Sequence, residues 1–281
     1  MIGWLLLGLG AVYLGICGFL FLRQRRMIFE PHVQASNPLP PELGLPYERI
    51  TIPVGSGEHL IGWWFPPAND DQPQKTLLLL HGTGGLTEFN FQAIALWHQA
   101  GYGALAFNYR GFGQSSPSFP HETQIYQDAL AAYDFLTQTK GIAPENLVLH
   151  GHSLGGAVAI ELANRCPVQG LFLENTFTSM LAVAMSNPLY RLFPVKWLLQ
   201  ERFDSAAKIA KLQRPIFICY GDLDGTVPKG MGKKLWAIAK DPKKFVSVPD
   251  ADHINLAAVA PTVLQQGITW LESFPSTDEN F

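Results

Sequence analysis

Short runs of apolar residues recur along this chain and alternate with stretches whose apolar residues follow a helical period. A run that is apolar on both faces is typical of a parallel strand buried in a sheet, because helices cover both sides of such a sheet. The runs of this kind are residues 77–80, 104–107, 147–149, 171–173, 216–220 and 245–248. Their alternation with helices predicts an α/β fold with a mostly parallel central sheet flanked by helices.

The helical pattern is clearest over residues 124–138, where apolar residues at spacings of three and four share one face. The residues on that face are Ile125, Ala129, Ala132, Tyr133 and Leu136. Helices are also expected over 229–240 and 261–274. The alternation lapses over 177–205, a stretch with Met, Pro and aromatic residues. This stretch forms either an ordinary helix on the sheet or a small cap over a pocket.

Two antiparallel strands are expected before the first buried run. Residues 47–54 and 60–65 are rich in β-forming side chains, and they flank the glycine-bearing loop Gly55-Ser56-Gly57. Such a loop between two strands is typical of a β-hairpin. The predicted order is therefore one hairpin followed by alternating strands and helices.

The first segment of the chain raises the question of a membrane. Residues 2–22 carry no charge, and about 21 helical residues span roughly 30 Å, the thickness of the hydrocarbon core. A cleavable signal peptide is the alternative, but it has its positive charges before the apolar run and a small-x-small site after it. Here Arg23, Arg25 and Arg26 follow the run. We therefore expect an uncleaved single-pass anchor, with the domain behind it on the cytoplasmic side.

These patterns divide the chain into four parts. Residues 2–22 form the predicted transmembrane anchor, and residues 23–46 form a basic and then proline-rich tether with five prolines after position 30. Residues 47–274 form the folded domain, and residues 275–281 are a tail. In this interpretation the anchor only holds the domain at the bilayer and supplies no catalytic group.

Composition excludes several classes of protein. The chain has 281 residues, of which 47% are hydrophobic and 15% are charged, which fits one large packed domain and not a disordered chain. Lys and Arg number 20 against 23 Asp and Glu, so no global positive field favours nucleic acid as a partner. The cysteines Cys17, Cys166 and Cys219 are too few and too far apart for a disulfide framework or a zinc knuckle.

Residues 151–155, Gly-His-Ser-Leu-Gly, form a Gly-x-Ser-x-Gly motif between a predicted strand and a helix rich in small residues. This turn is so sharp that side chains at the two glycine positions would collide, and it leaves the serine hydroxyl exposed above the sheet. The same pattern occurs by chance in ordinary loops. Its place between strand and helix instead indicates that Ser153 is a nucleophile.

A serine hydroxyl needs a base, and with this motif the base and its acid follow in the order Ser, acid, His. Of the eight histidines, only His253 comes after Ser153, and it lies just beyond the last predicted strand. The acid is either Asp222 or Asp224, both of which follow the strand at 216–220. We favour Asp224, because the Gly-x-x-Asp-x-x-Val-Pro spacing places it at the crest of the loop. The other aspartate is then a turn residue.

The tetrahedral oxyanion of acyl transfer needs backbone N–H donors. Leu154, at the start of the helix, supplies one, and Thr83 in the glycine-rich segment 81–85 is the expected second donor. The alternative for that segment is a plain glycine turn. His81, His150 and His152 lack carboxylates at metal-ligand spacing, and the chain has no P-loop or dinucleotide motif. We therefore expect neither a metal nor a cofactor.

With these residues in place, the chain from about residue 26 to about 274 resembles the α/β-hydrolase superfamily. Within it, the chain resembles small, N-terminally membrane-anchored serine hydrolases that include lipid esterases and protein depalmitoylases. The motifs that carry the resemblance are Leu-Ile-Gly-Trp-Trp at 60–64, His-Gly at 81–82, Asn-Tyr-Arg-Gly-Phe-Gly-Gln-Ser at 108–115, Gly-His-Ser-Leu-Gly-Gly at 151–156, Glu-Asn-Thr-Phe-Thr-Ser at 174–179, Arg-Phe-Asp at 202–204, and the segments around Asp224 and His253. Tyr220 and Asp252 depart from the pattern, since relatives commonly have His and Gly there.

The resemblance implies an α/β-hydrolase fold and a serine hydrolase that cleaves an acyl ester or thioester through an acyl-serine. The apolar first segment and the stretch 177–205 favour a lipophilic acyl substrate at the membrane. A serine peptidase is one alternative, because the same three residues cleave amides. A catalytically silent scaffold that binds a lipid or a partner is another, although such a scaffold has no chemical need for Ser153, Asp224 and His253 in order.

Overall fold

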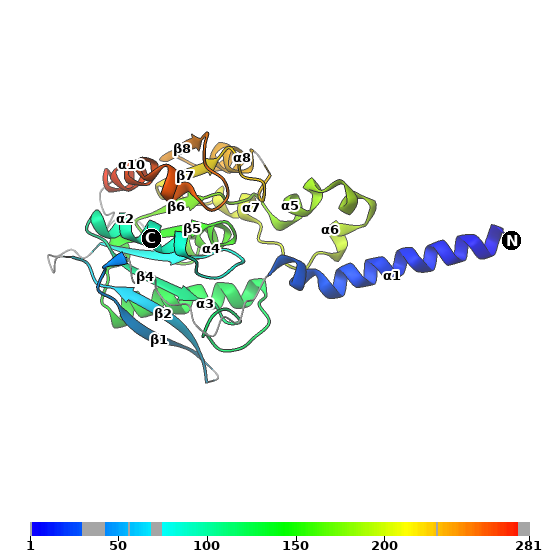
Figure 1. Ribbon diagram of the computed structural model, residues 1–281, viewed down its shortest axis with the longest axis horizontal. Helices are drawn as coiled ribbons and strands as arrows, with labels where there is room; N and C mark the ends of the chain where they lie inside the picture. Colours follow the sequence, from blue (N-terminus) through cyan, green and yellow to red (C-terminus); the bar gives the residue numbers. More distant parts are fainter. Residues whose placement is uncertain (1, 30–42, 56, 69–74, 229, 275–281) are drawn as a thin grey trace.

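A mostly parallel sheet runs through the centre of the protein (Figure 1). The computed structural model describes residues 2–29, 43–55, 57–68, 75–228 and 230–274. Within these residues the strands are β1 (Glu48–Gly55), β2 (Glu58–Phe65), β3 (Thr76–Leu80), β4 (Gly103–Asn108), β5 (Leu147–His152), β6 (Gly170–Glu174), β7 (Ile216–Gly221) and β8 (Lys243–Val248). They are ordered β1-β2-β4-β3-β5-β6-β7-β8. Among these strands, β2 alone runs in the direction opposite to the others, which confirms the predicted fold class.

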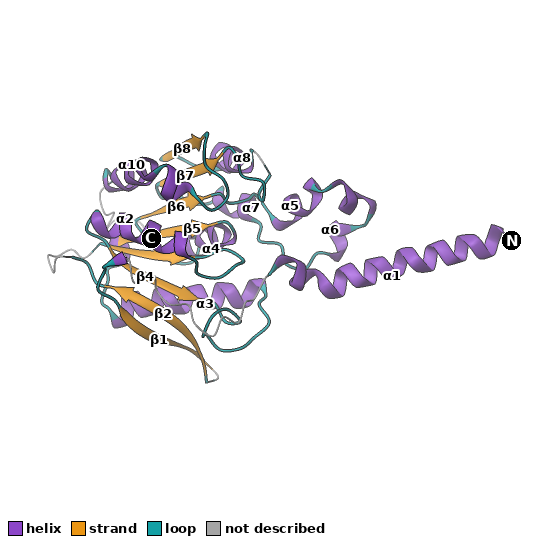
Figure 2. Cartoon of the chain, in the orientation of Figure 1, coloured by secondary structure: helices purple, strands orange, loops and turns teal. Residues whose placement is uncertain are grey.

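Helices cover both faces of this sheet (Figure 2). The helices of the described chain are α1 (Ile2–Ile28), α2 (Glu88–Gln99), α3 (Glu122–Asp134), α4 (Leu154–Ala163), α5 (Met180–Ser186), α6 (Val195–Leu198), α7 (Ser205–Ile209), α8 (Met231–Ile238), α9 (Leu256–Val259) and α10 (Pro261–Glu272). Shorter 3₁₀ turns are η3 (Pro144–Asn146) and η4 (Pro188–Leu192). Helices α3, α4, α7 and α8 share one apolar core, and α2, α9 and α10 share the other.

The alternation of side chains along each strand explains why the strands are apolar on both faces. In β3, Leu78 and Leu80 pack into the core under α4, whereas Leu77 and Leu79 pack into the core under α2 and α10. Every residue of β3 is buried. A parallel strand enclosed by helices on both sides has no solvent face to carry polar residues, so the run pattern in the sequence predicts it correctly.

Some elements differ from their sequence-based bounds. The helix predicted over 124–138 ends at Asp134 and continues as a π-helical turn, η2 (Phe135–Thr139), which keeps Leu136 fully buried in the core. The hairpin forms between β1 and β2 with the expected pairing, although Ser56 of its loop lies outside the described residues. Most of the predicted tether, residues 30–42, the predicted tail 275–281 and Lys229 also lie outside them.

Helix α1 extends past the apolar run and projects away from the sheet (Figure 1). It includes Arg23, Arg25 and Arg26 and ends at Ile28. The stretch 177–205 forms the short segments α5, η4 and α6 instead of one long helix on the sheet. We call residues 177–204 the cap, because they lie beside the C-terminal half of α1 and away from the sheet (Figure 1).

The crossing of β5, α4 and β3 is so close that it requires glycine. A Cβ added to Gly155 would lie 1.9 Å from the carbonyl oxygen of Leu80, the last residue of β3. A Cβ added to Gly156 would lie 2.4 Å from Oγ1 of Thr176. The first of these contacts is with backbone in a central strand, so no rotation of a side chain can relieve it.

The substitution Gly155→Ala should therefore destabilise the protein by about 3 kcal/mol or more, at or above the upper end of ordinary overpacking. Gly225→Ala is the matched control, because a Cβ there has nothing within 4 Å and the backbone is not left-handed. Thermal unfolding followed by circular dichroism measures both variants. An unchanged melting temperature for Gly155→Ala would contradict the close crossing.

Candidate active site

Ser153 lies in a strained turn between β5 and α4. Its backbone has φ +54° and ψ −118°. Residues other than glycine rarely adopt this conformation, so the surrounding structure must stabilise it. A Cβ on Gly151 would lie 2.4 Å from the carbonyl oxygen of Gly155, so the turn closes on itself only with glycine. The carbonyl oxygen of Ser153 accepts a hydrogen bond from the Thr176 hydroxyl at 2.7 Å. The turn thus holds the hydroxyl of Ser153 at the carboxyl end of the sheet.

His253 and Asp224 complete a hydrogen-bonded row with Ser153. The Nε2 atom of His253 is 3.1 Å from Ser153 Oγ, and its Nδ1 atom is 2.8 Å from Asp224 Oδ2. With Nδ1–H donated to the carboxylate, Nε2 is free to accept the serine proton. The structure thus brings the three predicted residues together from the ends of β5, β7 and β8.

The two candidate aspartates lie in the loop of residues 222–228 after β7, which we call the acid loop, and their hydrogen bonds differ. Asp224 is buried, and its Oδ1 accepts N–H bonds from Thr226 and Val227 at 2.8 and 2.9 Å. Asp222 instead accepts a hydrogen bond from the hydroxyl of Ser247 on β8. Tyr220, one of the departures from the family pattern, donates its hydroxyl to the carbonyl oxygen of Val227 at 2.5 Å. It therefore ties down the loop that carries Asp224.

Two residues that the sequence did not single out as site residues hold the loop of His253. His152 Nε2 donates to the carbonyl oxygen of His253 at 2.7 Å, and the Asn175 side-chain amide donates to the same oxygen at 3.1 Å. Burial lowers the pKa of His152 to about 4, so its ring is neutral near pH 7. Asp252, the other residue that departs from the family pattern, accepts hydrogen bonds from the N–H groups of Ile254 and Asn255. These contacts fix the backbone that aims the His253 ring.

A third buried group, His81, shapes the glycine-rich loop after β3. Its Nε2 accepts from the N–H of Tyr109 at 3.3 Å, which leaves Nδ1–H to donate to the carbonyl oxygen of Gly82 at 2.7 Å. Burial lowers the pKa of His81 to about 4, which keeps this neutral tautomer. A Cβ on Gly82 would lie 3.3 Å from Ser153 Cβ. The loop that carries Thr83 is therefore packed directly against the serine.

Both residues expected to supply the oxyanion donors lie near Ser153. Leu154 is the first residue of α4, and N–H groups in a first helical turn have no partner within the helix. Thr83 and Ser153 line the same cavities. Their roles as backbone donors stay a prediction, because that role concerns a substrate oxygen.

The other histidines in the described part of the chain do not gather into a metal site. His150 accepts from Trp97 Nε1 at 3.1 Å and donates Nε2–H to Glu174 at 3.0 Å. Although burial alone would raise the pKa of Glu174, the hydrogen bond from His150 and the nearby His152 hold it below its ordinary value. Among the residues that the structure describes, no group of three His, Cys, Asp or Glu side chains could hold a metal ion.

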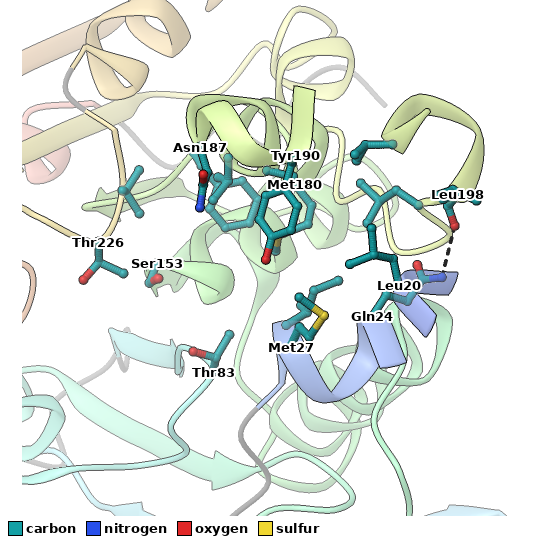
Figure 3. A pocket seen from close by; sticks show the side chains of 17 residues that line it. Leu20, Gln24, Met27, Thr83, Ser153, Met180, Asn187, Tyr190, Leu198 and Thr226 are labelled. Atoms are coloured by element: carbon teal, nitrogen blue, oxygen red, sulfur yellow. Dashed lines mark hydrogen bonds between the residues drawn. The ribbon is translucent and has the colours of Figure 1, made fainter. Parts of the chain in front are cut away.

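Two cavities meet at Ser153. The first has a volume of about 420 Å³ and a mostly apolar lining contributed mainly by the cap, the acid loop and α1 (Figure 3). The second has a volume of about 560 Å³ and is more polar, with Thr87, Glu88 and Gln92 beside the His253 loop. Ser153 and Thr83 border both. A molecule with an apolar part and a polar part could place the bond between them at Ser153.

Comparisons with known proteins agree with the fold described above. The family whose sequence pattern matches is described as serine aminopeptidase, S33, over residues 71–207. The chain is 31% identical over 241 residues to the uncharacterized protein Rv2307c of Mycobacterium tuberculosis, covering 85% of this chain and 83% of the relative. It is 29% identical over 259 residues to protein bem46 of Schizosaccharomyces pombe, covering 86% and 84%. A Pyrococcus furiosus esterase structure matches with a TM-score of 0.71 at 18% identity, covering 89% of this chain and 99% of that one.

The substitution Asp224→Asn should slow the reaction of Ser153 with a fluorophosphonate probe by roughly four orders of magnitude, because the amide favours the wrong imidazole tautomer. Asp222→Asn is the matched control two residues away, and its labelling rate should stay near that of the wild type. Time courses of labelling by gel fluorescence measure both. If the ranking of the two variants were reversed, the acid would be Asp222.

Proposed function

This chain belongs to the α/β-hydrolase superfamily, and from that premise we propose that it is a membrane-anchored serine hydrolase that cleaves acyl esters or thioesters through an acyl-serine. The observation that carries the proposal is the row of Ser153, His253 and Asp224 at the junction of an apolar and a polar cavity. The row supplies an activated nucleophile, and the cavities match a lipophilic acyl group with a polar leaving group.

In the first half of the reaction, Ser153 Oγ attacks the acyl carbonyl carbon while His253 Nε2 takes the hydroxyl proton. The carbonyl oxygen becomes an oxyanion, which the N–H groups of Thr83 and Leu154 hold. Asp224 stabilises the imidazolium through Nδ1. When the intermediate collapses, the bond to the leaving group breaks, and the alcohol or thiol departs with the proton from His253. The acyl group stays on Ser153.

In the second half, water replaces the leaving group. His253 takes a proton from the water as its oxygen attacks the acyl-serine, and a second oxyanion forms in the same place. Its collapse releases the carboxylic acid and returns the proton to Ser153 Oγ. Every proton passes through His253, so the proposed chemistry requires no metal or cofactor.

The membrane part of the proposal rests on α1. Within the described chain, this helix is long and apolar enough to cross a membrane. A cleaved signal sequence would meet the same criterion, but the side chain of Gln24 in α1 is buried and bonded to the backbone of Leu198 and Gln200 in the cap. A segment bonded to the enzyme in this way supports an anchor that is retained. The basic residues that follow the apolar run favour a cytoplasmic domain.

A serine aminopeptidase is a second candidate, since that is the description of the matching family. An aminopeptidase must bind the terminal ammonium group of a peptide, and Glu88 in the polar cavity is a carboxylate that could do so. The residues that line the apolar cavity include no charged side chain. We favour the acyl ester or thioester, because this uncharged cavity suits an acyl chain better than an ammonium group.

The wild-type protein should react with a fluorophosphonate probe and hydrolyse nitrophenyl butyrate, and Ser153→Ala should lose both activities by several orders of magnitude. Amino-acid nitroanilides, given to the same preparations, test the aminopeptidase alternative and should be cleaved far more slowly than the ester. Equal labelling of wild type and Ser153→Ala would contradict the assignment of the nucleophile. A wild type that neither reacts nor hydrolyses would favour a silent scaffold.

The proposed orientation predicts that protease added to intact cells leaves the domain of residues 47–274 uncut, whereas the same protease digests it once the membrane is permeabilised. Immunoblots against a C-terminal tag report the result. A known external protein that the same protease digests in intact cells serves as the accessibility control. Digestion of the domain in intact cells would place it on the outer face.

A further inference from the structure

The end of the predicted anchor forms part of the wall of the apolar cavity. Leu20, Gln24, Met27 and Ile28 of α1 line this cavity together with residues of the cap. In Figure 3, Ser153 and Thr83 lie at one side of the cavity, and Leu20 and Gln24 lie at the other. This differs from the sequence-based expectation that the segment only holds the domain at the bilayer. Removal of α1 would open the apolar cavity on one side.

Specific polar contacts fix α1 against the cap. The Gln24 side chain donates to the Leu198 carbonyl oxygen at 3.1 Å and accepts from the Gln200 N–H at 2.6 Å. The next residue of α1, Arg25, forms an ion pair of 2.7 Å with the buried Glu201. A buried side-chain amide with partners on another segment specifies one arrangement. The wall that α1 contributes is therefore a defined part of the site.

The contact between α1 and the cap continues into the apolar half of the helix. Tyr13 donates its hydroxyl to the Leu192 carbonyl oxygen at 3.2 Å and stacks on Phe193 with ring centroids 5.6 Å apart. Tyr13 lies nine residues before Leu22, which is roughly 14 Å along a helix. If α1 spans the bilayer, η4 of the cap therefore reaches into the apolar layer beside it.

The outer surface of the cap suits that depth. Leu189 and Leu192 on η4 are 67% and 68% exposed, and Trp197 on α6 is 80% exposed. A cluster of large, exposed apolar side chains is typical of a surface that contacts a membrane or a partner protein. Trp is also common where the hydrocarbon core of a bilayer meets the lipid headgroups. Because this surface adjoins the membrane-spanning candidate α1, lipid is the occupant that the structure favours.

We propose that the end of α1 and the cap form a lateral entrance through which a long acyl chain passes from the bilayer to Ser153. This inference rests on the proposed function and names its substrate class: amphiphilic esters or thioesters with one long acyl chain and a polar leaving group. The acyl chain lies in the apolar cavity against Leu20 and Met27 of α1. The leaving group lies in the polar cavity on the other side of Ser153.

The size of the apolar cavity sets the chain length. A molecule of liquid water takes up about 30 Å³, and a methylene group is of similar size, so a cavity of about 420 Å³ holds on the order of a dozen carbons. A short acyl chain fills only the part near Ser153, whereas a long chain extends to Leu20. Leu20 should therefore matter for long chains alone.

The test uses the full chain in phosphatidylcholine vesicles with two substrates, nitrophenyl butyrate in water and a palmitoyl ester in the vesicles. Leu20→Trp fills the far end of the cavity, and it should lower kcat/KM for the palmitoyl ester by about tenfold or more, the loss of about two buried methylene groups. Butyrate hydrolysis should fall by a several-fold smaller factor than palmitoyl hydrolysis, because a four-carbon chain does not reach Leu20. Leu22→Trp is the matched control, because Leu22 is 79% exposed on the same helix, and it should leave both rates unchanged.

A second variant tests the bilayer side of the entrance. Trp197→Glu places a charge on the outer surface of the cap, which is costly in an apolar layer. It should slow palmitoyl hydrolysis in vesicles but not when the same ester is presented in detergent micelles, whereas Leu20→Trp should slow it in both. Unchanged palmitoyl hydrolysis by Leu20→Trp, or an equal loss in Leu22→Trp, would overturn the entrance. Absence of butyrate hydrolysis and probe labelling in the wild type would instead refute the proposed function.

Discussion

The steric closeness of the turn at Ser153 is the constraint on which the site depends. Gly155 lies against the backbone of Leu80, and Leu80 pairs with Gly151 across the adjacent parallel strands β3 and β5. Because both strands run in the same direction, their carboxyl ends open at one edge of the sheet. The glycine-rich loop with Thr83 and the serine turn therefore emerge side by side. A larger residue at Gly155 would push apart the glycine-rich loop and the serine turn, which must lie side by side for the proposed reaction.

Two neutral, buried histidines hold the loops around Ser153 in fixed positions. His81 donates to the Gly82 carbonyl and His152 to the His253 carbonyl, so each ring holds a loop by its backbone and leaves the loop's own side chain free. Both rings are kept uncharged by burial. A charged ring at either place would add a proton donor where no acceptor is available. His253, which faces Ser153, is thereby positioned by the hydrogen bond from His152 to its carbonyl oxygen, whereas His81 holds the loop that carries Thr83.

Sequence reasoning reached the parts of the site that obey local rules. Ser153 is identified by its glycine spacing, His253 by being the one histidine downstream, and Asp224 by loop spacing, and the structure brings these three side chains together. The parallel strands β3 to β7 are buried throughout and are predicted from that pattern, although β5 extends three residues past the predicted 147–149. What the sequence could not indicate depends on tertiary contacts: Asn175 reaches His253 across 78 positions, and Gln24 reaches Leu198 across 174. The spacing of apolar residues does not indicate such pairs. In the sequence, Gln24 is only one polar residue within a basic cluster.

Because the two cavities differ in polarity, a substrate that binds across Ser153 has one favoured orientation. The apolar cavity includes α1 and the cap, whereas the polar cavity lies beside Glu88 and Gln92 of α2. In the proposed function, a substrate divided between them would leave its acyl chain near lipid and its leaving group near water, which is the way an amphiphile already lies at a membrane surface. Binding then moves the reactive bond a short distance and does not require the acyl chain to cross water, where its exposure would cost about 0.8 kcal/mol for each methylene group. In the proposed function, hydrolysis would likewise release the acid toward the bilayer and the polar product toward solvent, so the helix proposed as the anchor would also separate the two products.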